Sequence, residues 1–231
     1  MPQIRGVLFD KDGTLFDFQG TWGSWAQGLF LDLSGGDAAR AATLADVAGY
    51  DMESGVFDPA SPVIAHTPEE IAEVLLPHLP GASTLALVAR MNALAADAPM
   101  TEAVPLVPLL SRLRAAGLAL GVATNDAEHS ARSHLAAVGV EPLFDFVAGS
   151  DSGHGAKPAP GPLLAFARAA RLDPRQVVMV GDSAHDLHAG RAAGMACVAV
   201  LTGLATHDDL APLADAVLPD IGHLPAWLGL G

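Results

Sequence analysis

Two aspartates directly follow a short apolar stretch near the start of the chain, Gly6–Phe9, and are separated by Lys11. Four apolar or small residues in a row are typical of a buried parallel strand. Asp10 and Asp12 would lie on the same side of an extended chain, and Gly13 permits a sharp turn that brings main-chain groups close to a ligand. The stretch therefore offers a nucleophile, a nearby proton carrier and a metal-binding carbonyl. The alternative is an ordinary strand-to-turn junction, because Asp-Gly is common in turns.

Thr124 and Asn125 form a second candidate site, because they follow the apolar stretch 118–123, which predicts another strand. A hydroxyl, an amide and the N-terminus of the next helix together suit the binding of phosphoryl oxygens. The same residues also fit ordinary helix capping by Asn125 or Asp126. This stretch alone leaves both interpretations open.

Two more carboxylates follow a third apolar stretch, 177–180. Asp182 stands at the end of this predicted strand and can join Asp10 as a hard oxygen ligand of Mg²⁺. Asp186 lies one helical turn further on, where it can orient Asp182 or a water molecule and is a further candidate metal ligand. A first-turn acid favoured by the helix dipole is an equally good explanation of Asp186.

The two lysines of the chain are also candidates, because the other ten basic residues are all arginine. In such a chain a lysine indicates a position that needs a compact point charge. Lys157 precedes Pro158, which restricts its backbone and suits a fixed contact to phosphate or to the nucleophile. Lys11 fits equally well as a residue with a specific role in the site and as an ordinary surface charge.

Helix and strand patterns alternate from residue 101 onward, which predicts a parallel sheet with helices on both faces. Residues 17–100 have helical patterns apart from a long loop at 50–68, so they are expected to form a helical insertion into a core made of 1–16 and 101–231. In such sheets, ligands bind beyond the carboxyl ends of the strands. Strands are expected at 118–123, 144–148, 177–180, 196–201 and 215–218, and helices at 21–33, 37–48, 83–96, 105–116, 127–138, 162–171 and 184–193.

The composition is acidic and hydrophobic, with a net charge of −14 and 51% hydrophobic residues in 231. This charge argues against nucleic acid or an anionic membrane as a partner, so a small anionic molecule must be attracted by local positive groups. The single cysteine, Cys197, excludes an intrachain disulfide. A strand beginning by Ile4 leaves no room for a leader, and a cytoplasmic protein is expected, either a monomer or a homodimer.

The four polar stretches together resemble the motifs of the haloacid dehalogenase superfamily, in the same order along the chain. These are Asp10-Lys11-Asp12-Gly13-Thr14, Thr124-Asn125, Lys157-Pro158 and Gly181-Asp182-Ser183-Ala184-His185-Asp186. The resemblance implies a Rossmann-like core with a mobile helical cap, and the subgroup it looks like is the phosphoglycolate phosphatase type. The dehalogenases of the superfamily lack the second aspartate and its ion pumps have Thr there, so Asp12 favours a phosphohydrolase.

The resemblance, together with the local chemistry, implies a mechanism for each motif. Asp10 would attack phosphorus to form an aspartyl-phosphate, and Asp12 would act as general acid and then base. Mg²⁺ would be held by Asp10, the Asp12 carbonyl and Asp182. Thr124, Asn125 and Lys157, with main-chain groups near Gly13, would hold the other phosphoryl oxygens. A sugar-phosphate mutase on the same core and a non-catalytic phosphate-binding protein are the alternatives, although the latter is expected to lack a motif acid.

The charge content of the insertion is the best sequence-based indication of substrate. Between residues 17 and 100 the permanently cationic side chains are Arg40 and Arg90. Two arginines are too few for a bisphosphate, but one of them can hold a single carboxylate; alternatively, both lie on solvated helix faces. We therefore expect a small phosphomonoester of low charge, with 2-phosphoglycolate first by resemblance and a simple sugar phosphate next.

Overall fold

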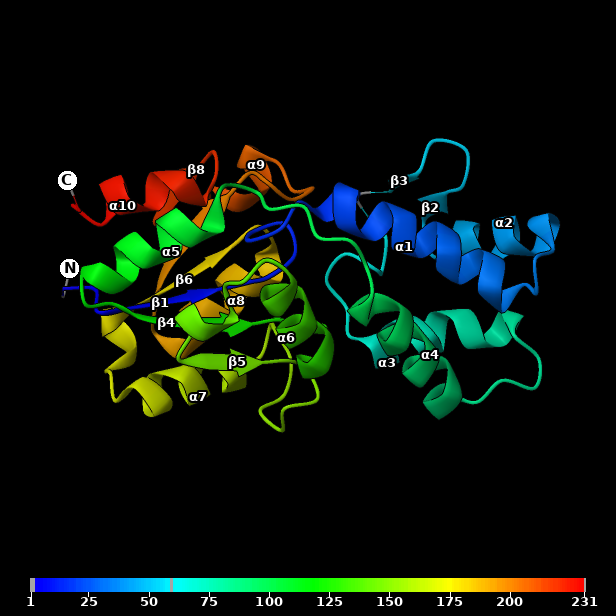
Figure 1. Cartoon of the computed structure of the whole chain (residues 1–231), viewed down its shortest axis with the longest axis horizontal. Coiled ribbons are helices and arrows are strands. Elements are labelled where there is room, and N and C mark those ends of the chain that lie inside the picture. Colours follow the sequence, from blue (N-terminus) through cyan, green and yellow to red (C-terminus); the bar gives the residue numbers. More distant parts are fainter. Residues whose placement is uncertain (1–2, 59, 231) are drawn as a thin grey trace.

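A computed structural model describes residues 3–58 and 60–230, which form two lobes joined side by side (Figure 1). One lobe is built on a six-stranded sheet with the strand order β5-β4-β1-β6-β7-β8, and every pairing in it is parallel. The other lobe is helical and contains the residues between β1 and β4. Both chain termini lie at the end of the sheet lobe that is remote from the helical lobe. The predicted α/β core with a helical insertion is confirmed.

The predicted strands are all present, with ends that differ by one or two residues. They are β1 (Gly6–Phe9), β4 (Ala119–Ala123), β5 (Phe146–Ala148), β6 (Val177–Gly181), β7 (Ala196–Val200) and β8 (Ala216–Leu218). β1 lies in the middle of the sheet, where it pairs with β4 on one side and β6 on the other. The residues that follow these three strands therefore meet at one edge of the sheet.

Alternate residues of β1 point to opposite faces of the sheet, as expected for a strand. Val7 and Phe9 pack into one hydrophobic cluster with α5 (Leu106–Ala115) and α6 (Glu128–Ala137). Leu8 packs into a second cluster on the other face, with α7 (Gly161–Ala170) and α8 (Ala184–Ala193). Because both faces are covered, the central strands are apolar along their whole length. The chain ends with the short helices α9 (His207–Leu210) and α10 (Leu224–Trp227).

The insertion is built from four helices around its own hydrophobic cluster, which includes Phe18, Trp22, Trp25 and Leu29. The helices are α1 (Phe18–Leu33), α2 (Ala38–Val47), α3 (Pro68–Leu75) and α4 (Thr84–Ala96). Two of these helices begin at the capping residues that the sequence indicated. Asp37 caps α2, and Thr67 caps α3 in a capping box with Glu70. One difference is that the predicted long loop contains a small antiparallel hairpin, β2 (Tyr50–Asp51) with β3 (Val56–Phe57), so the insertion is not purely helical.

The chain enters and leaves the insertion at the same place. The N–H of Asp17 donates to the Thr101 carbonyl at 2.8 Å, and the N–H of Ala103 donates to the Leu15 carbonyl at 2.9 Å. The two connecting segments are therefore paired with each other where the insertion joins the sheet lobe.

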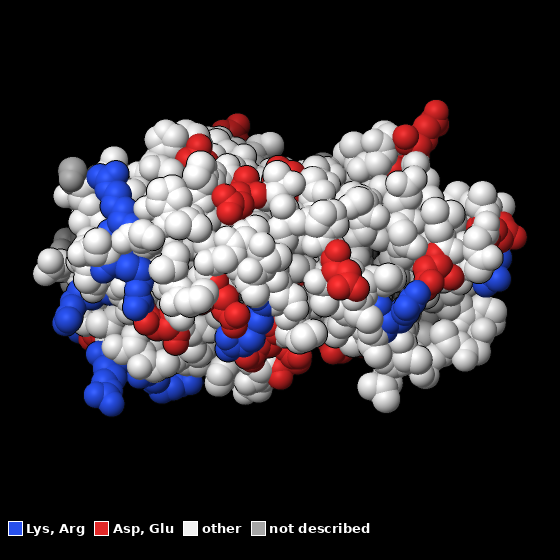
Figure 2. All heavy atoms as spheres, viewed as in Figure 1, with Lys and Arg blue, Asp and Glu red and all other residues white. Residues whose placement is uncertain are grey.

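On the face shown in Figure 2, acidic side chains are scattered over both lobes, and most of the basic ones lie on the sheet lobe, towards the end remote from the insertion. Within the described residues, no helix is both long and apolar enough to cross a membrane.

Close packing between β4 and α7 gives a test of the core. Gly121 faces Phe166, and a Cβ at position 121 would lie 2.6 Å from Phe166 Cδ2 and 3.0 Å from Leu8 Cδ1. We expect Gly121→Ala to lower the free energy of unfolding by about 1–3 kcal/mol, because overpacking a rigid core forces its neighbours to shift. Urea denaturation measures the effect. The double variant Gly121→Ala, Phe166→Leu should recover part of the lost free energy of unfolding. A Gly121→Ala protein as stable as the original would contradict this packing.

Candidate active site

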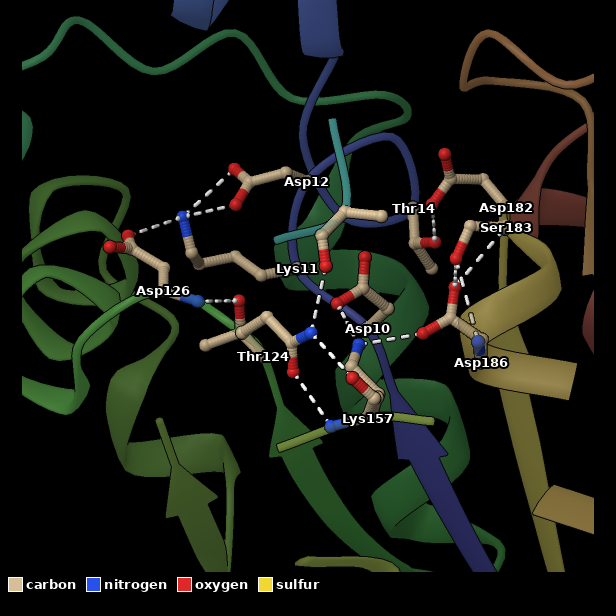
Figure 3. A network of polar contacts seen from close by, with 12 residues as sticks. Asp10, Lys11, Asp12, Thr14, Thr124, Asp126, Lys157, Asp182, Ser183 and Asp186 are labelled. Carbon is tan, nitrogen blue, oxygen red and sulfur yellow. Dashed lines mark hydrogen bonds and ion pairs between the residues drawn. The ribbon is translucent and has the colours of Figure 1, made fainter. Parts of the chain in front are cut away.

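Asp10, Thr124 and Asp182 lie together at the carboxyl edge of the sheet, because each follows one of three adjacent strands. They line one cavity, which is closed on its other side by residues of the insertion. Figure 3 shows the polar side chains of this edge converging from the segments that follow β1, β4 and β6 and from the segment that contains Lys157. The expectation that the predicted motifs meet at one place is therefore met by the fold.

Lys157 lies at the centre of one half of the site. Its Nζ donates to Asp10 Oδ1 at 2.5 Å and to Asp186 Oδ1 at 2.6 Å, and all three side chains are buried (Figure 3). Burial raises the pKa of Asp10 to about 7; Lys157 opposes this shift, and the neighbouring Asp186 and Asp12 add to it. Burial by itself lowers the pKa of Lys157, but the two carboxylates outweigh it and raise that pKa. Lys157 is therefore a fixed ammonium group beside Asp10.

Asp182 lies in a space that two glycines leave for it. A Cβ at Gly13 or at Gly203 would collide with the Asp182 carboxyl group, so neither position has room for a larger residue. Thr14 Oγ1 donates to Asp182 Oδ1 at 3.3 Å. Burial and the nearby charges of Asp10 and Asp186 raise the pKa of Asp182 well above its ordinary value. This carboxylate lacks a cationic partner among the described residues.

The arrangement fits a divalent cation. Asp10, Asp182 and Asp186 each offer a carboxylate oxygen, and these oxygens lie within 4.8 Å of one another. Oxygen ligands of this kind suit Mg²⁺ and Ca²⁺, and a bound cation would stabilise the ionised form of all three acids. Asp186 is the least available, because its oxygens already accept from Lys157 and, at 2.7 Å, from Ser183 Oγ.

Asn125 lies between Lys157 and the insertion. Its Nδ2 donates to the Ala65 and Lys157 carbonyls, both at 2.8 Å, and its Oδ1 accepts from the Lys157 N–H at 2.8 Å. Both ends of the amide are therefore occupied by main-chain groups in this structure, and a direct contact of Asn125 with phosphate stays a prediction. Asn125 fixes Lys157 and joins the core to the insertion. Thr124 remains available, since its hydroxyl accepts from the Asp126 N–H and is free to donate into the cavity.

Lys11 forms the centre of the other half of the site, which the sequence did not predict. It is fully buried, and its Nζ lies 2.7–2.8 Å from the Asp12 carboxylate oxygens and 3.2 Å from Asp126 Oδ2. It also lies 3.0 Å from His134 Nδ1 and 5.1 Å from the centre of the Trp22 ring. Burial, together with the charge of Lys11, lowers the pKa of His134 to about 4. His134 is one of two histidines in its helix, and nothing in the sequence around it indicated a contact with Lys11.

The insertion closes the cavity with mostly apolar side chains. The insertion residues that line it are Phe18, Trp22, Trp25, Val63, Ile64, Ala65, His66, Pro68, Ile71, Met91, Asn92 and Ala95. Neither Arg40 nor Arg90 is among them. Arg90 is half exposed and pairs with Asp32 on α1, while Arg40 lies at a separate surface hollow beside Leu33 and Leu87. Neither arginine lines the cavity in this structure, and a substrate contact by Arg40 or Arg90 stays a prediction.

The fold and the site are those of an α/β protein with a buried aspartate, a fixed lysine and a carboxylate cluster that could hold a metal ion, all at one edge of a parallel sheet. Residues 4–194 match the sequence profile of the haloacid dehalogenase-like hydrolases. The chain belongs to this family, and the predicted resemblance is confirmed.

Individual relatives and structures agree with this assignment. The chain is 31% identical to a phosphoglycolate phosphatase of Xanthomonas campestris, over 96% of this chain and 97% of the relative. It is 38% identical to a phosphoglycolate phosphatase of Rhodospirillum rubrum, where the match covers 52% of this chain and 50% of the relative.

Among solved structures, the fold is similar to that of a predicted phosphoglycolate phosphatase from Haemophilus somnus. The TM-score is 0.77 at 20% identity, and the match covers 98% of this chain and 99% of the other. It is also similar to a beta-phosphoglucomutase from Clostridium difficile, with a TM-score of 0.66 at 17% identity over 96% and 93% of the two chains. At these identities the structures indicate the fold alone, which phosphatases and mutases share.

Proposed function

We propose that this hydrolase is a Mg²⁺-dependent phosphatase that releases phosphate from small phosphomonoesters through a phosphoryl group carried on Asp10. The observation that carries the proposal is the Asp10 carboxylate, buried at the end of β1 between the Lys157 ammonium group and Asp182. Phosphoryl transfer depends mainly on positioning and on stabilising negative charge; this cluster positions the carboxylate and, with a bound cation, would stabilise the charge. The names of the full-length relatives support a phosphatase.

Each group has a role that follows from its place. Asp10 is the nucleophile, with one oxygen held by Lys157 and the other facing the cavity. Lys157 and the Thr124 hydroxyl hold phosphoryl oxygens. Asp12 protonates the leaving oxygen and then takes a proton from the water that releases phosphate. Asp186 holds Lys157 in place.

The residues that would hold the metal in this proposal are Asp10 and Asp182, with Asp186 close by; the family resemblance adds the main-chain carbonyl of Asp12. Mg²⁺ held there would neutralise charge on the phosphoryl oxygens and keep the Asp10 carboxylate ionised. The insertion, residues 17–100, acts as a cap domain on a core of 1–16 and 101–231. Its separate hydrophobic cluster and its paired connecting segments support this division.

A mutase remains the second candidate, because the same core can return the phosphoryl group to a sugar. Incubation with a hexose phosphate separates the two reactions: a phosphatase yields free phosphate, and a mutase yields an isomer.

The first test concerns the nucleophile. We expect Asp10→Asn to lower kcat by at least about 1,000-fold, because the amide has nearly the same shape but is a poor nucleophile, and covalent and acid–base groups commonly contribute that much. Phosphate release is measured with circular dichroism as a check on folding. Asp173→Asn is the matched control, because Asp173 is a partly exposed acid paired with Arg175 on the surface. A folded Asp10→Asn protein with more than a few per cent of the activity would refute the covalent mechanism.

The second test concerns the metal. We expect excess chelator to abolish activity and Mg²⁺ to raise the melting temperature of the unaltered protein by roughly 5 °C, because ligand binding to the folded state stabilises it. Asp182→Asn should lose the thermal shift while remaining folded, and Asp173→Asn should keep it. Full activity after dialysis against chelator would remove Mg²⁺ from the proposal.

The substrate is the finer question, and two observations bear on it. The relatives' names favour 2-phosphoglycolate. The charges in the cavity favour an uncharged leaving group, because Lys157 is the one Lys or Arg among the described lining residues and it already faces two carboxylates. Burial lowers the pKa of His185, so that ring does not supply a cation at neutral pH. A buried carboxylate without a cationic partner is costly.

We therefore expect isobutyl phosphate, an uncharged analogue with the shape of 2-phosphoglycolate, to be the better substrate at pH 7.5. The expected kcat/KM is at least about tenfold higher, which is the equivalent of about 1.4 kcal/mol. Steady-state phosphate release with both esters measures the ratio. A higher kcat/KM for 2-phosphoglycolate would favour the activity named for the relatives and would mean that His66, Asn92 or main-chain groups hold its carboxylate.

A further inference from the structure

Asp12 does not face Asp10 in this structure but faces Lys11. Its carboxylate oxygens lie 2.7 and 2.8 Å from Lys11 Nζ, and Figure 3 shows this pair on one side of the site, with Asp10 turned towards Lys157. Lys11 has no exposed surface, so its charge is compensated within the protein. A buried ammonium group with a short contact to the proposed proton carrier restricts where that carboxylate can go.

The other partners of Lys11 connect it to the insertion. Lysine has only donors, so the His134 Nδ1 that lies 3.0 Å from Nζ must be the acceptor. The proton of the neutral ring is then on Nε2, which donates to the Ala95 carbonyl at 2.6 Å. Ala95 is in the last turn of α4, and Trp22, whose ring covers Lys11, is on α1. One helix of the insertion, α1, thus contacts Lys11 directly, and a second, α4, is connected to Lys11 through His134.

The contacts are arranged in series from the insertion to the reacting groups. If the insertion moves away from the core, His134 loses the Ala95 carbonyl and Lys11 loses the Trp22 ring, while Asp12 and Asp126 stay on the core with Lys11. The ammonium group is then open to water, and its hold on Asp12 weakens because water competes for its three donors.

We propose that Lys11 is a positioning residue that sets the orientation of Asp12 for proton transfer, and that His134 and Trp22 make this orientation depend on contact with the insertion. The inference rests on the proposed function, since it needs Asp12 as the general acid. It differs from a purely structural role of Lys11 as a buried charge that balances Asp12 and Asp126. A structural role predicts an equal loss for all substrates.

Two substrates that differ in their need for a general acid separate these roles. An alkoxide is a strong base and leaves only when protonated, whereas p-nitrophenolate leaves without a proton. The measured quantity is kcat/KM, because it reports transfer of the phosphoryl group to Asp10 and not the later release of phosphate. The alkyl substrate is isobutyl phosphate or 2-phosphoglycolate, whichever the unaltered enzyme hydrolyses faster.

We expect Lys11→Met to lower kcat/KM for the alkyl ester by about 100-fold and for p-nitrophenyl phosphate by less than about threefold, since a positioned general acid is commonly worth that first factor. Asp12→Asn should give the same selective pattern. Arg114→Met, which removes a partly exposed cation paired with Asp145, is the control and should change neither value. If Lys11→Met does not fold, the double variant Lys11→Met, Asp126→Asn is measured instead. The second substitution removes one of the two buried carboxylates that lose their cation in Lys11→Met.

The link to the insertion is tested at His134. His134→Leu removes the hydrogen bonds to Lys11 and to the Ala95 carbonyl and should lower kcat/KM for the alkyl ester selectively. His134→Gln, whose amide has a donor and an acceptor, should restore part of this kcat/KM. An equal loss for both esters, or no loss, in the Lys11 variants overturns the proposal, and an unselective His134→Leu overturns its link to the insertion. If the unaltered protein hydrolyses neither ester, the proposed function has failed, and that result is distinct from failure of the Lys11 inference.

Discussion

The crowding of carboxylates at one edge of the sheet is the constraint on which the rest of the site depends. Asp10, Asp182 and Asp186 are buried within reach of a single cation, and Asp12 and Asp126 lie beside them. Ionised groups in such a space repel one another and resist burial. Lys157 compensates one side of the cluster and Lys11 the other. Asp182, which has neither lysine as a direct partner, is the acid that most requires an added cation.

The two lysines divide the site into halves with separate tasks. In the proposed mechanism, the half around Lys157 would hold the attacking carboxylate and the phosphoryl group, and the half around Lys11 would hold the proton carrier. Each half also has one hydrogen bond to a main-chain carbonyl of the insertion. Asn125, which fixes Lys157, donates to Ala65, and His134, which contacts Lys11, donates to Ala95. Because both acceptors are main-chain carbonyls, these two hydrogen bonds do not depend on which side chains the insertion presents to substrate.

Much of the fold, and the half of the site around Lys157, was predictable from sequence, because the sequence patterns that indicate them are local. Apolar strands followed at once by Asp10, Thr124 and Asp182 fix where these residues meet, since neighbouring parallel strands end at the same edge. The hairpin of the insertion was missed, because strands of two residues leave no periodic pattern. Its stretch has the glycine and prolines of a loop.

What sequence reasoning missed in the site depends on contacts between distant segments. The amide of Asn125 suggested a phosphate ligand, but its partners lie 60 and 32 residues away, at Ala65 and Lys157. Arg90 suggested a substrate contact, but its helix turns it outward to Asp32. Lys11 was left open because its partner His134 is 123 residues away. In each case the residue type was informative, and its direction was set by tertiary packing.

The charge of the site also constrains the order in which its ligands bind. The whole chain is strongly acidic, and the cavity lining has five aspartates and one lysine. A phosphate dianion that approaches this lining alone meets net repulsion, because Lys157 is already compensated by Asp10 and Asp186. In the proposed mechanism, a divalent cation between Asp10 and Asp182 would cancel the charges of these two carboxylates at the position where phosphorus must come within reach of Asp10. On that proposal we expect metal binding to precede or accompany substrate binding, and the apolar wall of the insertion to select the leaving group by its shape and lack of charge.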